Sequence, residues 1–227
     1  MREMSRFWFI LVLALAGCAN TGTSDARFGQ TGGPVVLDGS IAPTIKVSDI
    51  GEALDQFMGP DGNSLILLPN RLDRSKLDFS LESLIEIDSW LADVHTINKL
   101  QAGEGRAGEM LMMDGRGDNS VTFAGLYMGQ VIRANSELTW QWERFDTFLK
   151  ANPVFAEHYG QSPGLDTFVL VGPQGVATPI NTALKRVVSG KEESVHYIAQ
   201  LLMTEIDMDK ALSGPDYLGM ERRDWEG

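Results

Sequence analysis

A single cysteine, Cys18, is the feature that most limits how this chain can fold. One thiol cannot form an intramolecular disulfide, and it cannot build a thiolate metal cluster. The fold must therefore be stabilised by a hydrophobic core. The chain has 227 residues, which are enough to bury most of its apolar surface in one such core.

A short apolar segment precedes Cys18. Arg2 and Arg6 precede ten apolar residues, 7–16, and small residues end the stretch. This order is typical of an export signal. At about 1.5 Å of helix rise per residue, ten residues are too few to cross a bilayer core, which needs about 20. We expect residues 1–17 to be a cleaved signal peptide rather than a membrane-spanning helix.

The last four residues of this stretch are Leu15, Ala16, Gly17 and Cys18. They resemble the lipobox of bacterial lipoproteins at all four positions. The resemblance implies cleavage after Gly17, diacylation of the Cys18 thiol and usually a further acyl chain on the new amino terminus. Several chains anchor stably, because each buried methylene contributes about 0.8 kcal/mol. The alternative is an ordinary export signal in which the cysteine stands by chance.

The residue after the cysteine is Ala19 rather than aspartate. In lipoproteins of Gram-negative bacteria this implies sorting to the outer membrane. The resemblance therefore implies a protein that is lipid-anchored to the outer membrane and faces the periplasm.

The charge balance excludes one class of partner. The chain carries 31 acidic and 19 basic residues, for a formal net charge of −12. Such a surface repels nucleic acids and anionic lipid headgroups. We expect no nucleic-acid partner, and we expect the lipid bilayer to be contacted through the acyl chains on Cys18.

Composition divides the rest of the chain into three parts. Residues 18–33 are rich in Gly, Thr, Ser and Asn without a hydrophobic period, and we expect a flexible tether that spans about 20 Å. Residues 34–205 are predicted to form a single globular domain, with a possible N-terminal sub-lobe at 34–70. Residues 206–227 are predicted to be a peripheral acidic tail.

Helical periodicity is clearest after Ser80, which is a candidate N-cap with Phe79 and Leu84 as a hydrophobic staple. The predicted buried face is Leu84, Ile87, Leu91 and Val94, with Trp90 and Ile97 beside it. The predicted polar face, on the opposite side of the helix, is made of Glu86, Asp88 and Asp93.

Three further helices are predicted. One follows Ser48 and ends at Met58. A second is capped by Thr178, begins with Pro179 and ends at Gly190, with Lys185 and Arg186 near its negative end. The third has an apolar face made of Val195, Ile198, Ala199 and Leu202.

Four segments predict strands. Residues 44–47 and 64–68 lie on either side of the first helix and suggest a small strand, helix, strand unit. Residues 138–142 alternate between apolar and polar, whereas 167–171 are apolar on both faces and should lie centrally in a sheet. We therefore predict an α+β fold in which a mainly antiparallel sheet packs with several amphipathic helices.

Trp140 and Trp142 share the apolar side of their predicted strand. Two indoles on one face favour core packing, since the alternation already accounts for both. Tryptophan is also enriched at binding interfaces, so the pair could instead line a groove.

Residues 101–120 are rich in glycine and charge and predict a mobile loop. Arg116, Gly117 and Asp118 match the tripeptide that integrins recognise, although a simple turn accounts for them. Asp114, Asp118 and Asn119 are suitable oxygen ligands for calcium, but their spacing departs from the EF-hand pattern. A solvated acidic loop at 114–120 is the simpler interpretation, and we predict neither metal nor cofactor.

Gly125 and Gly129 are four residues apart within the stretch 121–134. Gln130 and Arg133 make this stretch too polar to span a membrane. We expect the two glycines to let a helix approach another element closely.

Residues 77–202 also resemble a group of uncharacterised bacterial domains, for which no activity can be carried over. The matching residues are Asp78, Phe79, Ser80, Ser83, Leu84, Gly125, Tyr127, Gly129, Val131, Trp140, Pro179, Lys185, Arg186, Gly190 and Ser194.

Three histidines, His95, His158 and His196, are the candidates for general bases. No nucleophile turn, histidine pair with metal-ligand spacing or phosphate-binding glycine motif accompanies them in the sequence. The leading hypothesis is a non-enzymatic envelope protein that binds a protein partner. The alternatives are an envelope hydrolase that uses His158 and an immunity lipoprotein that blocks a toxin.

Overall fold

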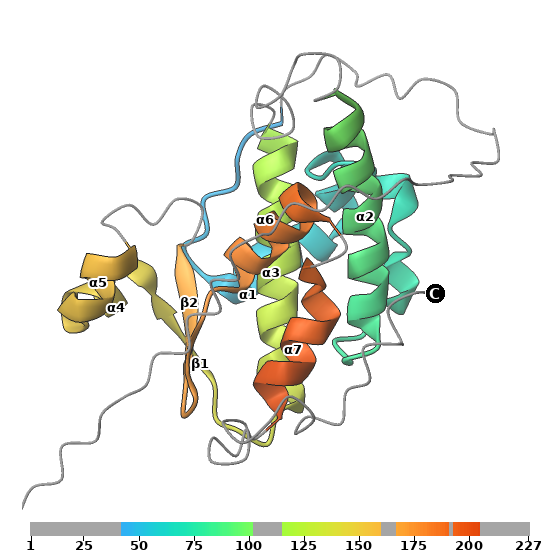
Figure 1. Ribbon diagram of the computed structural model, residues 1–227. Helices are drawn as coiled ribbons and strands as arrows, with labels where there is room; N and C mark the ends of the chain where they lie inside the picture. The colour runs from blue at the N-terminus through green and yellow to red at the C-terminus, as the bar shows by residue number, and fades with distance from the viewer. Residues whose placement is uncertain (1–41, 102–114, 160–166, 191–192, 205–227) are drawn as a thin grey trace, which may run out of the picture.

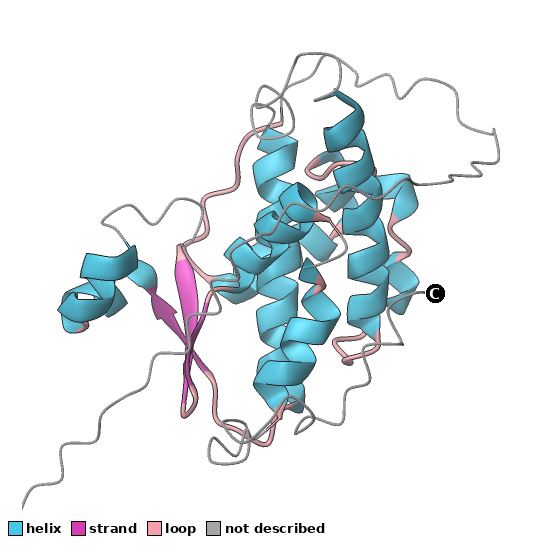
Figure 2. Cartoon of the chain, in the orientation of Figure 1, coloured by secondary structure: helices cyan, strands magenta, loops and turns pink. Residues whose placement is uncertain are grey.

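The computed structural model describes residues 42–101, 115–159, 167–190 and 193–204. They form a single packed α+β domain that is mostly helical, with a small sheet on one side of the helices (Figure 1; Figure 2). The α-helices are α1 (Ile50–Met58), α2 (Ser83–Gln101), α3 (Gly115–Asn135), α4 (Phe145–Ala151), α5 (Pro153–Tyr159), α6 (Pro179–Ser189) and α7 (Val195–Met203). Three short 3-10 helices cover Pro60–Ser64, Pro69–Arg71 and Arg74–Lys76. The strands are β1 (Gln141–Arg144), β2 (Phe168–Gly172) and β3 (Gly175–Ala177).

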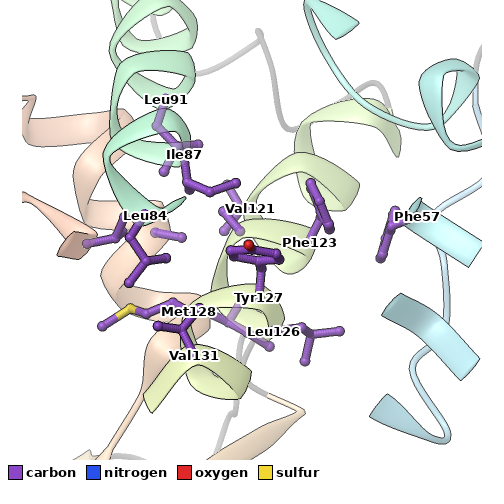
Figure 3. Packing of buried hydrophobic residues seen from close by; sticks show 14 of the residues in the cluster. Phe57, Leu84, Ile87, Leu91, Val121, Phe123, Leu126, Tyr127, Met128 and Val131 are labelled. Atoms are coloured by element: carbon purple, nitrogen blue, oxygen red, sulfur yellow. The ribbon is translucent and has the colours of Figure 1, made fainter. Parts of the chain in front are cut away.

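Helix α3 is the central element of the domain. Every residue from 119 to 129 is buried, because other elements pack around the whole circumference of the helix. Figure 3 shows Leu84, Ile87 and Leu91 of α2 on one side of α3 and Phe57 of α1 on the other. The sequence permits this position, since no charged residue occurs between 119 and 129.

The two glycines of α3 bring it close to its neighbours, as predicted. A Cβ added to Gly125 would lie 2.4 Å from the Cα of Ile180 in α6. A Cβ added to Gly129 would lie 2.1 Å from the ring of Trp142 in β1. Real side chains cannot approach so closely, so both contacts depend on glycine.

The predicted helices are present with small shifts at their ends. Asp49 rather than Ser48 caps α1, through a hydrogen bond from the Glu52 amide to its Oδ1 atom. Ser80 accepts a hydrogen bond from the Ser83 amide where α2 begins. Gly190 ends α6 with a φ of 86°, which favours glycine.

Two of the predicted strands are wrong. Residues 44–47 and 64–68 are buried or half-buried in part but join no sheet. Their backbone groups pair with side chains instead: the Asn119 amide accepts from Ile45 N–H and donates to the Leu65 carbonyl. The Ser120 hydroxyl accepts from Leu67 N–H in the same way. These bonds satisfy buried backbone groups without a strand ladder.

The predicted mobile loop is also wrong in part. Residues 102–114, which include Asp114, lie outside the described residues. Residues 115–120 form the first turns of α3 rather than a loop, so the tripeptide Arg116 to Asp118 is helical and not a turn.

The sheet is antiparallel, and its order is β1-β2-β3. The prediction that the segment 167–171 lies centrally is confirmed, because β2 pairs on both edges. The predicted strand at 138–142 is shifted, since β1 begins at Gln141.

The sheet separates two hydrophobic clusters. One face carries Phe168, Leu170 and Ala177, which belong to the main core around α3. On the other face Val169 packs in a smaller cluster with aromatic side chains of α4 and α5. The smaller cluster is made of Phe145, Phe148, Phe155 and Val169, with Leu149, Val171 and Val176 beside it.

Candidate functional site

The carboxylate of Asp88 joins three helices. It accepts a hydrogen bond from the Arg186 guanidinium of α6 at 3.2 Å. It also accepts from the Ser194 hydroxyl and from the backbone N–H groups of Val195 and His196, at 2.9 and 3.0 Å. Asp88 of α2 therefore caps the N-terminus of α7 while it pairs with α6. A carboxylate at a helix N-terminus is favourable, because the free N–H groups there carry partial positive charge.

The prediction that Asp88 lies on an exposed polar face of α2 is wrong. Its side chain is only 14% exposed, and that of Arg186 is 7% exposed. The sequence did contain a signal, because Asp88 is four residues after Leu84 and three before Leu91, within the apolar stripe. Among the described residues, the Nη1 atom of Arg186 is buried without a hydrogen-bond partner. The cluster has the form of a structural clamp, since each bond joins parts of the fold.

A second polar cluster lies around Tyr127, which is fully buried in α3. Its hydroxyl accepts from the Phe79 N–H at 2.8 Å and lies 2.7 Å from the Ser83 hydroxyl. The Phe79 ring stacks on Tyr127 at 4.7 Å, and Phe79 has a positive φ of 62°. Burial raises the pKa of the Tyr127 hydroxyl. These contacts hold the start of α2 against α3.

The two tryptophans have different surroundings. Trp140 is buried, and its ring lies against Gly172 of β2, where a Cβ would approach it to 2.5 Å. Trp142 is half-buried, with its ring against Gly129 of α3. Trp140 is therefore a core residue, whereas Trp142 lies between the core and the surface.

A hollow of about 410 Å³ opens beside Trp142, near the end of the β1–β2 pair. Gln141, Glu143 and Val171 contribute to it and share one face of the sheet, because they stand at alternate positions of paired strands. The hollow is lined by Thr139, Gln141, Trp142, Glu143, Val171, Gly172 and Pro173. Its one charged lining residue is Glu143, and Trp142, Val171 and Pro173 make it partly apolar.

Among the side chains that the structure describes, the candidate histidines form no catalytic cluster. The Nδ1 atom of His95 lies 2.7 Å from the carbonyl oxygen of Val187, so Nδ1 carries the proton and donates it. His196 bonds to Asp88 through its backbone. His158 lies in helix α5, and its side chain is outside the described part of the structure.

The possible calcium ligands have other roles where the structure describes them. Asn119 is fully buried, and its amide bonds to the backbone at Pro43, Ile45 and Leu65. Partial burial raises the pKa of Asp118, which disfavours its charged form. Within the described ranges, no group of three or more His, Cys, Asp or Glu residues could hold a metal ion.

No described helix is both long and apolar enough to span a bilayer. The chain was compared with protein-family models, with curated proteins and with solved structures, and none of the three comparisons gave a match.

Proposed function

We propose that this chain is a lipoprotein of a bacterial cell envelope, anchored to the outer membrane through Cys18, whose domain binds a protein partner. The observation that carries the anchoring is the motif Leu15, Ala16, Gly17 and Cys18 directly after ten apolar residues. Acylation at this point would place the acidic domain within about 20 Å of the bilayer, at the end of the tether 18–33.

The chemistry of the domain supports a binding role. Arg186 and Ser194 both donate to Asp88 across helices, and Tyr127 bonds to Ser83 and Phe79. These groups are used to hold the fold together. The hollow beside Trp142 offers a partner an apolar floor and the carboxylate of Glu143. A partner with a basic side chain would fit both this carboxylate and the net charge of −12.

Metabolic labelling with a radioactive fatty acid tests the anchor. We expect the wild-type chain to take up the label and Cys18→Ser to take up none, because the thiol is lost, and the variant should remain the unprocessed precursor. An Ala19→Ser variant is the matched control and should label and mature like the wild type. Normal maturation or labelling of Cys18→Ser would refute lipid attachment at Cys18.

Site-specific photocrosslinking in intact cells tests the binding role. A photoreactive residue at Pro173, which lines the hollow, should give a discrete product with a second protein. The same residue at Lys150, exposed on α4, is the control and should give none. Identical patterns from the two positions would argue against the hollow as a binding surface.

A further inference from the structure

Among the described residues, strand β1 has one edge that pairs with no other strand, called the open edge below. Its other edge pairs with β2, and the Phe145 N–H donates to the Thr167 carbonyl at 3.1 Å in the same register. Hydrogen-bonded pairs alternate along an antiparallel ladder, so Gln141 and Glu143 direct their backbone groups to β2. The backbone N–H and C=O of Trp142 consequently point to the open edge.

Trp142 is the centre of this edge. On one side, the Trp140 carbonyl accepts from the Arg133 guanidinium at 3.4 Å. On the other side, Arg144 is the N-cap of α4, and the carbonyl of an N-cap residue accepts the first bond of its helix. Among the interactions between described residues, none engages the Trp142 backbone.

A second copy of β1 fits this edge by symmetry. When two identical strands pair antiparallel about a twofold axis at one residue, that residue exchanges both hydrogen bonds with its own copy. One free N–H and one free C=O on the same residue are what such an axis requires. Strand β1 also contains no proline, one of the devices that commonly protect sheet edges.

The side chains suit the same register. With Trp142 on the axis, Gln141 lies opposite Glu143 of the second copy, and the contact occurs twice. An amide can donate to a carboxylate, and no like charges stand directly opposite each other. We propose that β1 pairs with β1 of a second copy of this chain, which joins two three-stranded sheets into one of six strands. This inference goes beyond the proposed anchoring and does not depend on it.

Sedimentation equilibrium of the full chain in detergent tests the proposal. The wild type should dimerise, and Gln141→Glu should raise the dissociation constant about 2- to 30-fold, since two favourable contacts become repulsive. Adding Glu143→Lys to Gln141→Glu should restore dimerisation by creating two opposite-charge pairs. Thr147→Glu adds the same charge at an exposed position of α4 and should have little effect.

Disulfide capture tests the register itself. In a Cys18→Ser background, chains with Gln141→Cys are mixed with chains with Glu143→Cys and oxidised. Opposite residues of a non-hydrogen-bonded pair have Cα atoms about 4.5 Å apart, within disulfide range. Mixed dimers should form, and Thr147→Cys chains should form none.

Three results would overturn the self-pairing of β1. They are a wild-type chain that stays monomeric, a Gln141→Glu variant that behaves like Thr147→Glu, and Gln141→Cys and Glu143→Cys chains that form no mixed dimer on oxidation.

Discussion

Removing the carboxylate of Asp88 should destabilise the fold strongly. Asp88→Asn would leave the buried Arg186 guanidinium without its counter-charge and weaken the cap of α7. Breaking one partner of a buried ion pair costs about 3–5 kcal/mol. We expect a loss of that order in the free energy of unfolding, measured by urea denaturation.

An exposed ion pair provides the control for Asp88. Asp73 pairs with Lys76 at 3.7 Å, but their side chains are 48% and 62% exposed. Asp73→Asn should therefore change stability little, because solvent screens the pair. Equal losses for the two substitutions would contradict the clamp assigned to Asp88.

Gly129 should be intolerant of any side chain while Trp142 is present. Gly129→Ala places a methyl group 2.1 Å from the Trp142 ring, and overpacking of a core costs about 1–3 kcal/mol. In a Trp142→Ala background the same change should cost much less, because the obstructing ring is gone. A double-mutant cycle by urea denaturation measures this coupling, and additive effects would refute the contact.

Tyr127 should make the free energy of unfolding fall as the pH rises through the alkaline range. The folded pKa is raised above the unfolded value of about 10, so the protonated hydroxyl is favoured in the fold. Its contribution is complete below about pH 10 and is lost as the pH rises through the folded pKa. The free energy of unfolding between pH 8 and 11 should fall less steeply for Tyr127→Phe. Equal slopes would show that Tyr127 ionises as readily folded as unfolded.

At the scale of elements, helix α3 holds two irregular segments in place through its first turns. Asn119→Ala would leave the backbone groups of Ile45, Pro43 and Leu65 without these partners. The bond to Leu65 is buried and the other two are only partly buried, and an unsatisfied buried group costs about 1–3 kcal/mol, so a loss of about 1–3 kcal/mol is expected. Hydrogen exchange of the Ile45 amide should also accelerate, and unchanged exchange would contradict the role of Asn119.

The helices could be predicted from the sequence because their periodicity and caps are local. The apolar stripe from Leu84 to Val94 and the pair Pro179 and Gly190 are visible within a few residues. Strands at 44–47 and 64–68 were predicted wrongly, because a short apolar run indicates burial without saying what pairs with its backbone. That pairing depends on Asn119 and Ser120, which are 53 or more residues away in sequence.

The candidate site was predictable only in part for the same reason. The alternation at 138–142 indicated that one face of the tryptophan strand is buried, and Gly129 indicated a close approach. Neither pattern shows that the two meet, since the contact joins α3 to β1 across the fold. Likewise, Asp88 and Ser194 are 106 residues apart, and their bond exists only once three helices have packed.

At the scale of the whole molecule, the domain combines a helical core around α3 with a small sheet, in which β1 is an edge strand among the described residues (Figure 1). Its stability comes from the core and from polar clamps such as Asp88, in keeping with a chain that has no disulfide to rely on. The tether 18–33 and the acyl chains on Cys18 are proposed to hold this domain at a membrane. This anchoring depends on cleavage before Cys18 and acylation of its thiol.

Mass spectrometry of the intact protein purified from membranes tests the cleavage and acylation at Cys18. We expect a chain that begins at Cys18 and is heavier than residues 18–227 by the mass of a diacylglyceryl group, usually with one further acyl chain. A chain that retains residues 1–17, begins elsewhere or carries no lipid would refute lipid attachment at Cys18.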